Sequence, residues 1–131
     1  MAPRGWTNTF HRNEVVHAAL RAFYEAGKPV AVICHATCAL LETRRADGSL
    51  LVEGKTWTGF ADSEEDYADE FVGQRIQPFR IEEEATKLDG TNFIVSSRFK
   101  SHAVRDGLLI TGQQQYSGAA AARLVIEALG V

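Results

Sequence analysis

A short run of apolar residues that ends directly in a cysteine constrains the fold of this chain more than any other feature. Val30-Ala31-Val32-Ile33 is rich in β-branched side chains, and Cys34 follows it at once. Such a run is typical of a strand that is buried on both faces of a parallel sheet. We therefore expect Cys34 at the carboxyl end of a buried strand, where α/β proteins place their functional groups.

Helix patterns flank this strand on both sides. Asn13 is a suitable N-cap, apolar residues recur behind it at helical spacing, and Gly27 stands where a helix ends. The other expected strands lie at 55–58, at 92–96 and on either side of the Asp106-Gly107 turn. The other expected helices lie at 35–42, 62–71, 78–88 and 117–129. Helices that alternate with strands predict α/β layers with a largely parallel sheet.

The size and charge of the chain bound its organisation and its partners. A length of 131 residues suits one domain, which we assign to residues 1–131 with an irregular lead-in over 1–12. The net charge of -3 gives no general electrostatic reason to expect nucleic acid or an anionic membrane as a partner. No apolar run approaches membrane-spanning length, and the N-terminus has no apolar signal core.

The two cysteines, Cys34 and Cys38, are expected to be free thiols. A disulfide between residues four apart would close a small loop and stabilise little. No second pair of metal ligands accompanies them, which argues against zinc. Free thiols fit a reducing compartment, so we expect the protein in the cytoplasm. Cys38 is interpreted as a residue that packs one face of its helix.

A cysteine at the junction of a strand and a helix is a candidate nucleophile. The sharp turn would present the sulfur of Cys34 above the edge of the sheet. The N-terminus of the following helix favours the thiolate form, and the next backbone N–H can bind a developing oxyanion. A cysteine is also a small apolar side chain that often fills a core. The residues alone leave both readings open.

The acidic and imidazole side chains near this cysteine are ambiguous on sequence alone. Neighbours such as Cys34 and His35 need not meet in a tight turn. Glu65 lies in the segment 62–70, which holds six acidic residues and therefore favours a solvated helix face. The remaining histidines show no ligand-like spacing, and His17 is expected on a helix surface; they are His11, His17 and His102.

Several motifs in order resemble those of the ThiJ/PfpI superfamily, which has the class I glutamine amidotransferase-like fold. The resemblance begins near residue 13 and extends to the end of the chain, and its motifs together are far more specific than any one of them. They are Gly27-Lys28-Pro29 through Cys34-His35, Glu53-Gly54-Lys55 leading into Thr58-Gly59-Phe60, Ser63-Glu64-Glu65, Gln77-Pro78-Phe79 with Glu82-Glu83, and 104–113. The stretch around Phe60 is similar to the branch that contains glutathione-independent glyoxalases and stress chaperones.

The resemblance implies a fold and a set of site residues. It implies a flavodoxin-like, largely parallel sheet flanked by helices, of which this chain matches the C-terminal part and lacks the opening strands. The resemblance also places an oxyanion donor and a glutamate that hydrogen-bonds the nucleophile in that absent N-terminal part. It implies Cys34 as nucleophile, His35 as general acid and base, and Glu65 as the carboxylate that orients His35. The chain departs from the family at Ala36, where glycine is usual, and at residues 114–116.

The resemblance also implies functions and partners. We expect either conversion of methylglyoxal to lactate or a related protein deglycase activity, with a small reactive aldehyde as substrate and no metal or organic cofactor. A sheet without its opening strands predicts a homodimer that covers the exposed edge. The alternatives are a redox-sensing or chaperone-type stress protein and, as an outsider, a PfpI-type cysteine peptidase. A glutamine amidotransferase is disfavoured because His102 is not followed by the expected His-x-Glu pattern.

Overall fold

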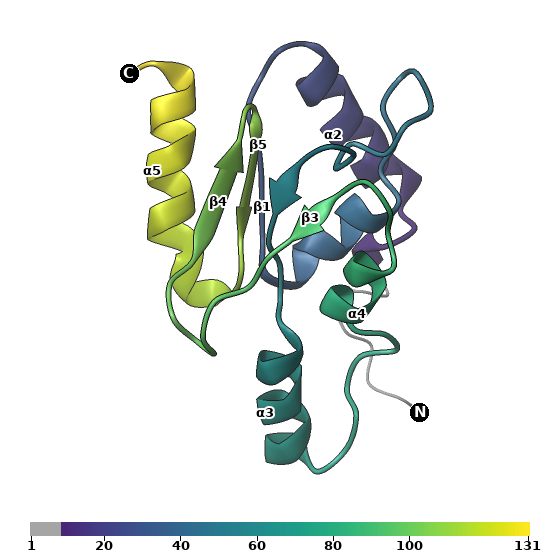
Figure 1. Cartoon of the computed structure of the whole chain (residues 1–131), viewed down its shortest axis with the longest axis vertical. Coiled ribbons are helices and arrows are strands. Elements are labelled where there is room, and N and C mark those ends of the chain that lie inside the picture. Colours follow the sequence, from purple (N-terminus) through teal and green to yellow (C-terminus); the bar gives the residue numbers. More distant parts are fainter. Residues whose placement is uncertain (1–8) are drawn as a thin grey trace.

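A three-stranded sheet forms the centre of the computed structural model, which describes residues 9–131 (Figure 1). Its strand order is β1-β5-β4, with β1 at Val30–Ile33, β4 at Ala103–Asp106 and β5 at Leu109–Gly112. β1 runs parallel to β5, with Val30 opposite Leu109, whereas β4 and β5 form an antiparallel hairpin. The predicted turn at Asp106-Gly107 therefore accounts for the one antiparallel pairing of a sheet that is otherwise parallel.

β1 lies at the edge of this sheet, because β5 is its only strand partner among the residues that the structure describes. Helices cover the sheet from both sides. α5 (Gly118–Leu129) packs on one face, and α2 (Glu14–Glu25) and the 3₁₀ helix η1 (Cys34–Leu41) pack on the other (Figure 1). The expected α/β fold of a sheet flanked by helices is thus confirmed.

The first described elements confirm one prediction and correct two. The carboxamide of Asn13 accepts hydrogen bonds from the backbone N–H groups of Val15 and Val16, so it caps α2 as expected. His17 was expected on the surface of this helix, but it is buried, because its Nε2 donates a 2.8 Å hydrogen bond to the carbonyl of His11. The lead-in was expected to be irregular; residues 1–8 lie outside the described part, but residues 9–10 are helical.

A second, two-stranded parallel sheet packs beside the first. It consists of β2 (Thr56–Trp57) and β3 (Asn92–Phe93), in which Trp57 is fully buried with its ring edge-on to that of Phe93. The strand predicted over 92–96 is shorter than expected. The backbone N–H of Ser96 donates instead to the side chain of Gln113, which draws the chain away from β2.

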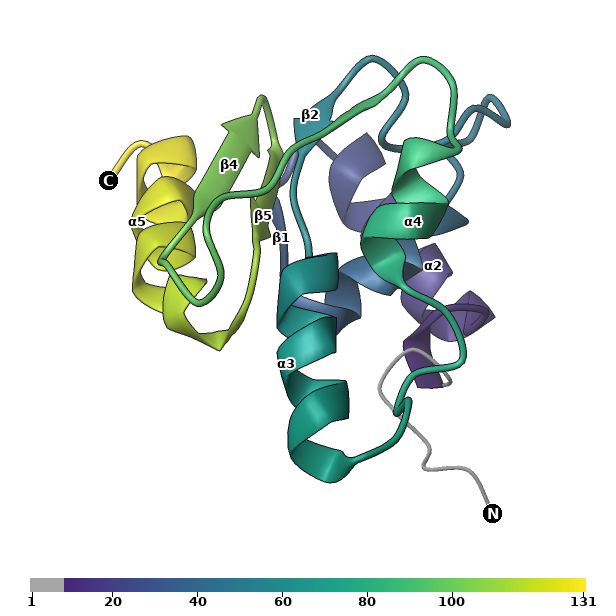
Figure 2. The same ribbon diagram turned by 60° about the horizontal axis from the view of Figure 1, so that its bottom comes forward.

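Two helices, α3 (Asp62–Val72) and α4 (Ile81–Thr86), connect β2 to β3 (Figure 2). α3 lies beyond the carboxyl ends of β1 and β5, and α4 packs against η1. α4 was expected to start at Pro78 and to extend to residue 88, which is wrong at both ends. The guanidinium of Arg80 pairs with Asp66 and Asp69 of α3 and holds this residue in an extended N-cap conformation, so the helix begins at Ile81.

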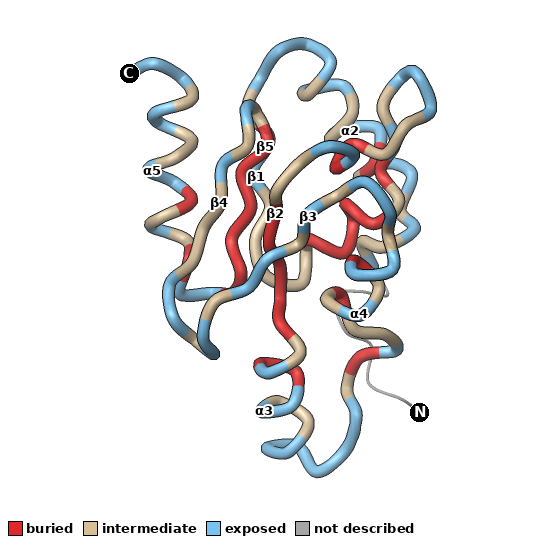
Figure 3. The backbone as a smooth tube through the Cα atoms, in the orientation of Figure 1, coloured by how far each residue is buried: buried red, intermediate tan, exposed pale blue. Residues whose placement is uncertain are grey.

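The core lies between the sheet and the η1 layer, where β5 is buried along its whole length (Figure 3). Its largest apolar members come from segments far apart in sequence: Leu40, Leu51, Trp57, Ile81 and Leu109. Burial of such side chains contributes about 1.5–3 kcal/mol each to the stability of the fold. No helix of the described part is long and apolar enough to cross a membrane.

Candidate active site

Cys34 stands at the sharp turn between β1 and η1. Its φ angle is +59°, a left-handed conformation that is uncommon for residues other than glycine and that tends to mark functional sites. The hydroxyl of Thr37 donates a 2.7 Å hydrogen bond to the carbonyl of Cys34 and so stabilises the turn. Cys34 therefore lies at the carboxyl end of a strand, as predicted. The strand itself was expected to be buried on both faces, which is wrong: only Val30 of β1 is buried and Ala31 is exposed, because β1 lies at the edge of the sheet in the described part.

The turn brings Cys34 and His35 together although they are adjacent in sequence. Sγ of Cys34 lies 3.7 Å from Nδ1 of His35, within the range of a hydrogen bond that involves sulfur. The opposite ring nitrogen of His35 donates a 2.5 Å hydrogen bond to Oε1 of Glu65. The three residues thus form a continuous chain from sulfur through imidazole to carboxylate, the arrangement that activates cysteine nucleophiles.

Glu65 is buried rather than solvated, in contrast to the reading that its acidic neighbourhood favoured. Only 4% of its surface is exposed. A buried carboxylate requires partners, and the imidazole of His35 provides one. The surrounding segment is acidic because its other face reaches solvent, so composition alone did not reveal which carboxylate turns inwards.

The ring of Phe60 stacks on one face of the imidazole of His35. The two rings stack with a centroid distance of 3.9 Å and an interplanar angle of 30°. Burial would lower the pKa of His35, but its hydrogen bonds to Cys34 and Glu65 outweigh that effect and raise the pKa to about 9. At neutral pH the ring is therefore protonated, which places a positive charge beside the sulfur of Cys34.

Glu64, the neighbour of Glu65, has a structural role that the sequence did not predict. Its carboxylate is fully buried and accepts hydrogen bonds from the backbone N–H groups of Ala61 and Phe99. It thereby caps the first turn of α3, which carries Glu65. A glutamate three residues after an N-cap is a recognisable capping signal, and this spacing could have identified it.

Glu82 of α4 secures the same helix end. Its Oε2 accepts a 2.7 Å hydrogen bond from the backbone N–H of Asp62, the first residue of α3. Asp62 itself has a pKa raised to about 6, first by burial and then by the negative charges of Glu82 and Glu83. Glu82 of the motif therefore anchors α3 and does not line the pocket beside Cys34.

Two glycines in the predicted motifs permit close approaches beside the site. A Cβ on Gly59 would lie 2.3 Å from Oγ1 of Thr37, the residue that stabilises the cysteine turn. A Cβ on Gly112 would lie 2.6 Å from a side-chain carbon of Ile33, the last residue of β1. The absence of side chains at both positions allows β2 and β5 to pack tightly around the end of β1.

A pocket of about 220 Å³ opens beside the sulfur of Cys34. It is lined by Phe10, Ile33, Cys34, His35 and Ala36. Apart from the reacting pair, the lining side chains are apolar, so the pocket suits a small uncharged molecule. Sequence reasoning missed Phe10, which precedes the region that carried the resemblance and had no motif of its own.

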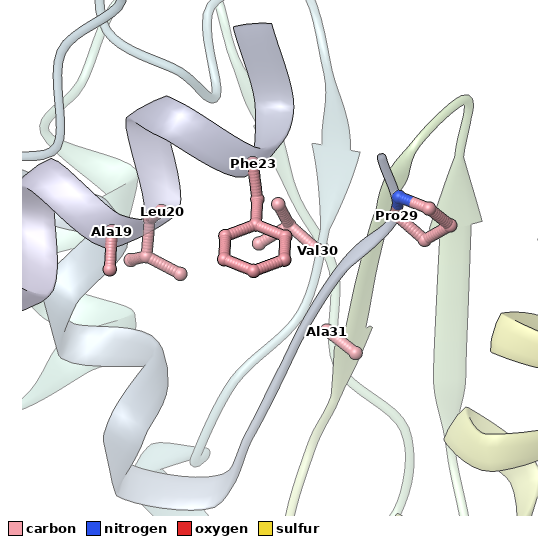
Figure 4. A pocket seen from close by; sticks show the side chains of 6 residues that line it. All are labelled: Ala19, Leu20, Phe23, Pro29, Val30 and Ala31. Atoms are coloured by element: carbon pink, nitrogen blue, oxygen red, sulfur yellow. The ribbon is translucent and has the colours of Figure 1, made fainter. Parts of the chain in front are cut away.

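A second hollow of about 200 Å³ lies between α2 and β1 (Figure 4). Figure 4 shows Leu20 and Phe23 of α2 together with Val30 of β1 around it. All of its lining side chains are apolar. None of these described side chains could act in acid–base or nucleophilic chemistry.

Cys38 is separated from this chemistry. It is fully buried in η1, and burial raises the pKa of its thiol to about 12. It therefore packs the core, as expected. His102 also lies apart, and burial lowers its pKa below the ordinary value.

Comparisons with known proteins agree with this architecture. The sequence profile of the DJ-1/PfpI family matches residues 4–128. A search of curated proteins finds no match. The crystal structure of the protein APC35852 is 35% identical, with a TM-score of 0.83 over 95% of this chain and 54% of its own.

Two further structures are similar in fold. The rapid encystment protein of 24 kDa from Francisella tularensis is 24% identical, with a TM-score of 0.83 over 94% of this chain and 53% of its own. Glyoxalase III from Candida albicans is 23% identical, with a TM-score of 0.79 over 93% and 52%. The chain thus spans about half the length of these structures. With a family match over most of its length, the chain belongs to the DJ-1/PfpI family, as its motifs predicted.

Proposed function

We propose that this chain carries the reactive centre of a glutathione-independent glyoxalase that converts methylglyoxal to lactate. The observation that supports this most is the chain of contacts from Sγ of Cys34 through His35 to Glu65, at 3.7 Å and 2.5 Å. The apolar pocket beside the sulfur suits a small neutral aldehyde. The likeness in fold to a glyoxalase III agrees with the proposal but does not carry it.

The first step is addition of the thiolate to the aldehyde. Sγ of Cys34 forms a bond to the aldehyde carbon, and the electron pair of the C=O double bond moves to oxygen. The protonated His35 gives its Nδ1 proton to that oxygen, which yields a hemithioacetal and a neutral imidazole. Glu65 stabilises the protonated ring before this transfer through the hydrogen bond at Nε2.

The next step moves a proton between neighbouring carbons. The neutral His35 removes the proton of the former aldehyde carbon, which gives an enediolate, and returns it to the adjacent carbon. The hydroxyl proton of the first carbon passes to the oxygen of the second, so that the first becomes a carbonyl and the second an alcohol. One carbon is oxidised and its neighbour reduced, so no outside oxidant or reductant takes part. The product is a thioester on Cys34, which water hydrolyses to lactate and the free thiol.

The direct test is lactate formation from methylglyoxal without glutathione. We expect Cys34→Ser to abolish it, and Glu65→Gln to reduce it by about 100-fold, because a misoriented imidazole is a poor proton carrier. Cys38→Ala serves as the matched control, since this thiol is buried outside the pocket. Turnover that survives Cys34→Ser contradicts the proposal.

A deglycase activity would use the same thiolate against an adduct of the aldehyde on a protein.

A chaperone-type or redox-sensing role is the second candidate, and exposed apolar residues and an open strand edge favour it. Val15 and Phe23 of α2 are 80% and 52% exposed, and the edge of β1 is unpaired in the described part. Suppression of aggregation that persists in Cys34→Ser, without any turnover of aldehydes, would select this role. Peptide cleavage that depends on Cys34 would instead select the PfpI-type peptidase.

We further propose that the protein is a homodimer in the cytoplasm. The open edge of β1 and the apolar hollow beside it would pair with the same surface of a second copy. Sedimentation at micromolar concentration should then show a species larger than 14.4 kDa. A monomer that binds no hydrophobic dye contradicts this assembly. The two free thiols agree with a reducing compartment.

A further inference from the structure

We infer that Phe10 determines the size of the molecule that can reach Cys34, and that His11 and His17 hold Phe10 in place. The inference rests on the proposed function for its substrate, a small α-oxoaldehyde. It assigns a task to a segment that lies before the helix α2 and outside the motifs. Phe10 is thus a residue that sets specificity, and the two histidines are positioning residues.

The pocket geometry gives Phe10 this place. The other lining residues, Ile33, Cys34, His35 and Ala36, are consecutive at the end of β1 and the start of η1. Among the residues that the structure describes, Phe10 is the only member of this lining that comes from a different part of the chain. It is partly buried and packs against the core, so its ring forms the opposite wall. A wall from a separate segment can change the width of a pocket without touching the reacting pair.

Three contacts fix the segment that carries Phe10. Nε2 of the buried His17 donates a 2.8 Å hydrogen bond to the carbonyl of His11. Nδ1 of His11 lies 3.4 Å from the carbonyl of Cys38 in η1, the helix that begins with the nucleophile. The ring of His11 also packs on Phe79, with centroids 4.5 Å apart. The residue after Phe10 is therefore tied both to α2 and to the helix of the nucleophile.

The apolar side chains that line the pocket indicate which substrates can reach Cys34. Ile33, Ala36 and Phe10 offer no hydrogen bond or charge from their side chains to a substrate, so they select by size and shape. A compact alkyl group beside the two carbonyls fits this description, whereas an aryl group would have to displace the ring of Phe10. An apolar pocket distinguishes substrates by about 10- to 200-fold for each methylene that does not fit.

The test uses a matched pair of thiol reagents, N-methylmaleimide and N-benzylmaleimide. The thiolate of Cys34 adds to the carbon–carbon double bond, and the neighbouring carbon takes a proton, so both reagents react identically except in size. We expect Phe10→Ala to raise the ratio of the benzyl rate to the methyl rate by at least about 10-fold. Mass spectrometry of the Cys34 peptide gives both rates, and Cys38 is too deeply buried to interfere.

Graded variants keep the test decisive, because Phe10 also packs against the core. Phe10→Leu should raise the ratio less than Phe10→Ala, and Phe10→Trp should lower it. His11→Ala should raise it without altering the pocket lining itself. The control is Phe71→Ala, which removes a phenyl ring that is 83% exposed near the end of α3 and should leave the ratio unchanged.

An unchanged ratio across the folded Phe10 variants overturns the inference, as does an equal rise in Phe71→Ala. The ratio requires a reactive Cys34 but no turnover, so it distinguishes this inference from the proposed function. If the wild-type chain forms no lactate but the ratio still shifts, the glyoxalase proposal fails and the size selection stands. If lactate forms, Phe10→Ala should also raise kcat/KM for phenylglyoxal relative to methylglyoxal.

Discussion

The backbone N–H of Phe99 donates a 2.9 Å hydrogen bond to Oε2 of Glu64, a fully buried carboxylate 35 residues earlier in the chain. Phe99 has a φ angle of +58°, so a non-glycine residue is held in the left-handed region at this contact. The other oxygen of Glu64 accepts from the N–H of Ala61. The bond ties the loop before β4 to the helix turn that carries Glu65.

Glu64→Ala should therefore destabilise the protein and disturb the site. It leaves the N–H groups of Ala61 and Phe99 without their acceptor, and each buried unsatisfied group costs about 1–3 kcal/mol. Urea denaturation measures the loss. The neighbouring Ser63→Ala, at an exposed position, is the control and should have little effect. Equal stability of the two variants would show that Glu64 does not anchor this turn.

Iodoacetamide at neutral pH should modify Cys34 and leave Cys38 unmodified. Cys34 lines the pocket, whereas Cys38 has no exposed surface and a thiol pKa of about 12. Peptide mass spectrometry after short labelling distinguishes the two. Preferential labelling of Cys38 would remove the basis for Cys34 as the nucleophile.

The stability of the fold should depend on pH through His35. Its pKa rises from an ordinary 6.5 to about 9 in the folded state, so the folded protein binds its proton more tightly than the unfolded chain. The resulting stabilisation is fully present below pH 6.5 and is lost as the pH rises through 9. It amounts to at most about 3 kcal/mol.

Denaturation curves between pH 6 and pH 10 test this dependence, and NMR titration of the imidazole reads the pKa directly. Glu65→Gln removes one of the two partners that raise the pKa, so it should lower the pKa of His35 and flatten the curve. A wild-type His35 that titrates near 6.5 would contradict the hydrogen-bonded chain described above.

Gly59→Ala should destabilise the site more than an ordinary surface substitution. The added Cβ would lie 2.3 Å from Oγ1 of Thr37 and would force apart β2 and the cysteine turn. Overpacking of this kind costs about 1–3 kcal/mol. Thermal denaturation measures it, with Gly118→Ala as control, because a Cβ there meets no atom within 4 Å. If both variants melt alike, the tight packing at Gly59 is not required.

The chain alone should turn over methylglyoxal slowly, because it spans about half the length of its structural relatives. The family resemblance assigns an oxyanion donor and a carboxyl partner of the cysteine to the unmatched half. Loss of one oxyanion donor costs about 100- to 1000-fold in rate. Fusion to the N-terminal half of a relative should restore that rate. The rate at which Cys34 is alkylated should be similar in the chain alone and in the fusion, because the turn that carries Cys34 is present in both. Equal turnover by the chain and the fusion would contradict this assignment.

The sequence by itself determined the local elements around the nucleophile. The β-branched run before Cys34, the cap at Asn13 and the turn at Asp106-Gly107 act over a few residues, so their patterns predict structure reliably. The ordered motifs also predicted the family, and two of them contain a glycine, Gly59 or Gly112, at a close approach that the fold requires.

The tertiary structure alone decided which side chains meet. Composition favoured a solvated Glu65 and a surface His17, but both are buried, since partners far along the chain or across a turn satisfy their polar groups. Phe10 joined the pocket because the chain folds its segment against η1. Periodicity reports the face of one helix or strand, whereas burial of a charge depends on what packs on that face, which no local pattern encodes.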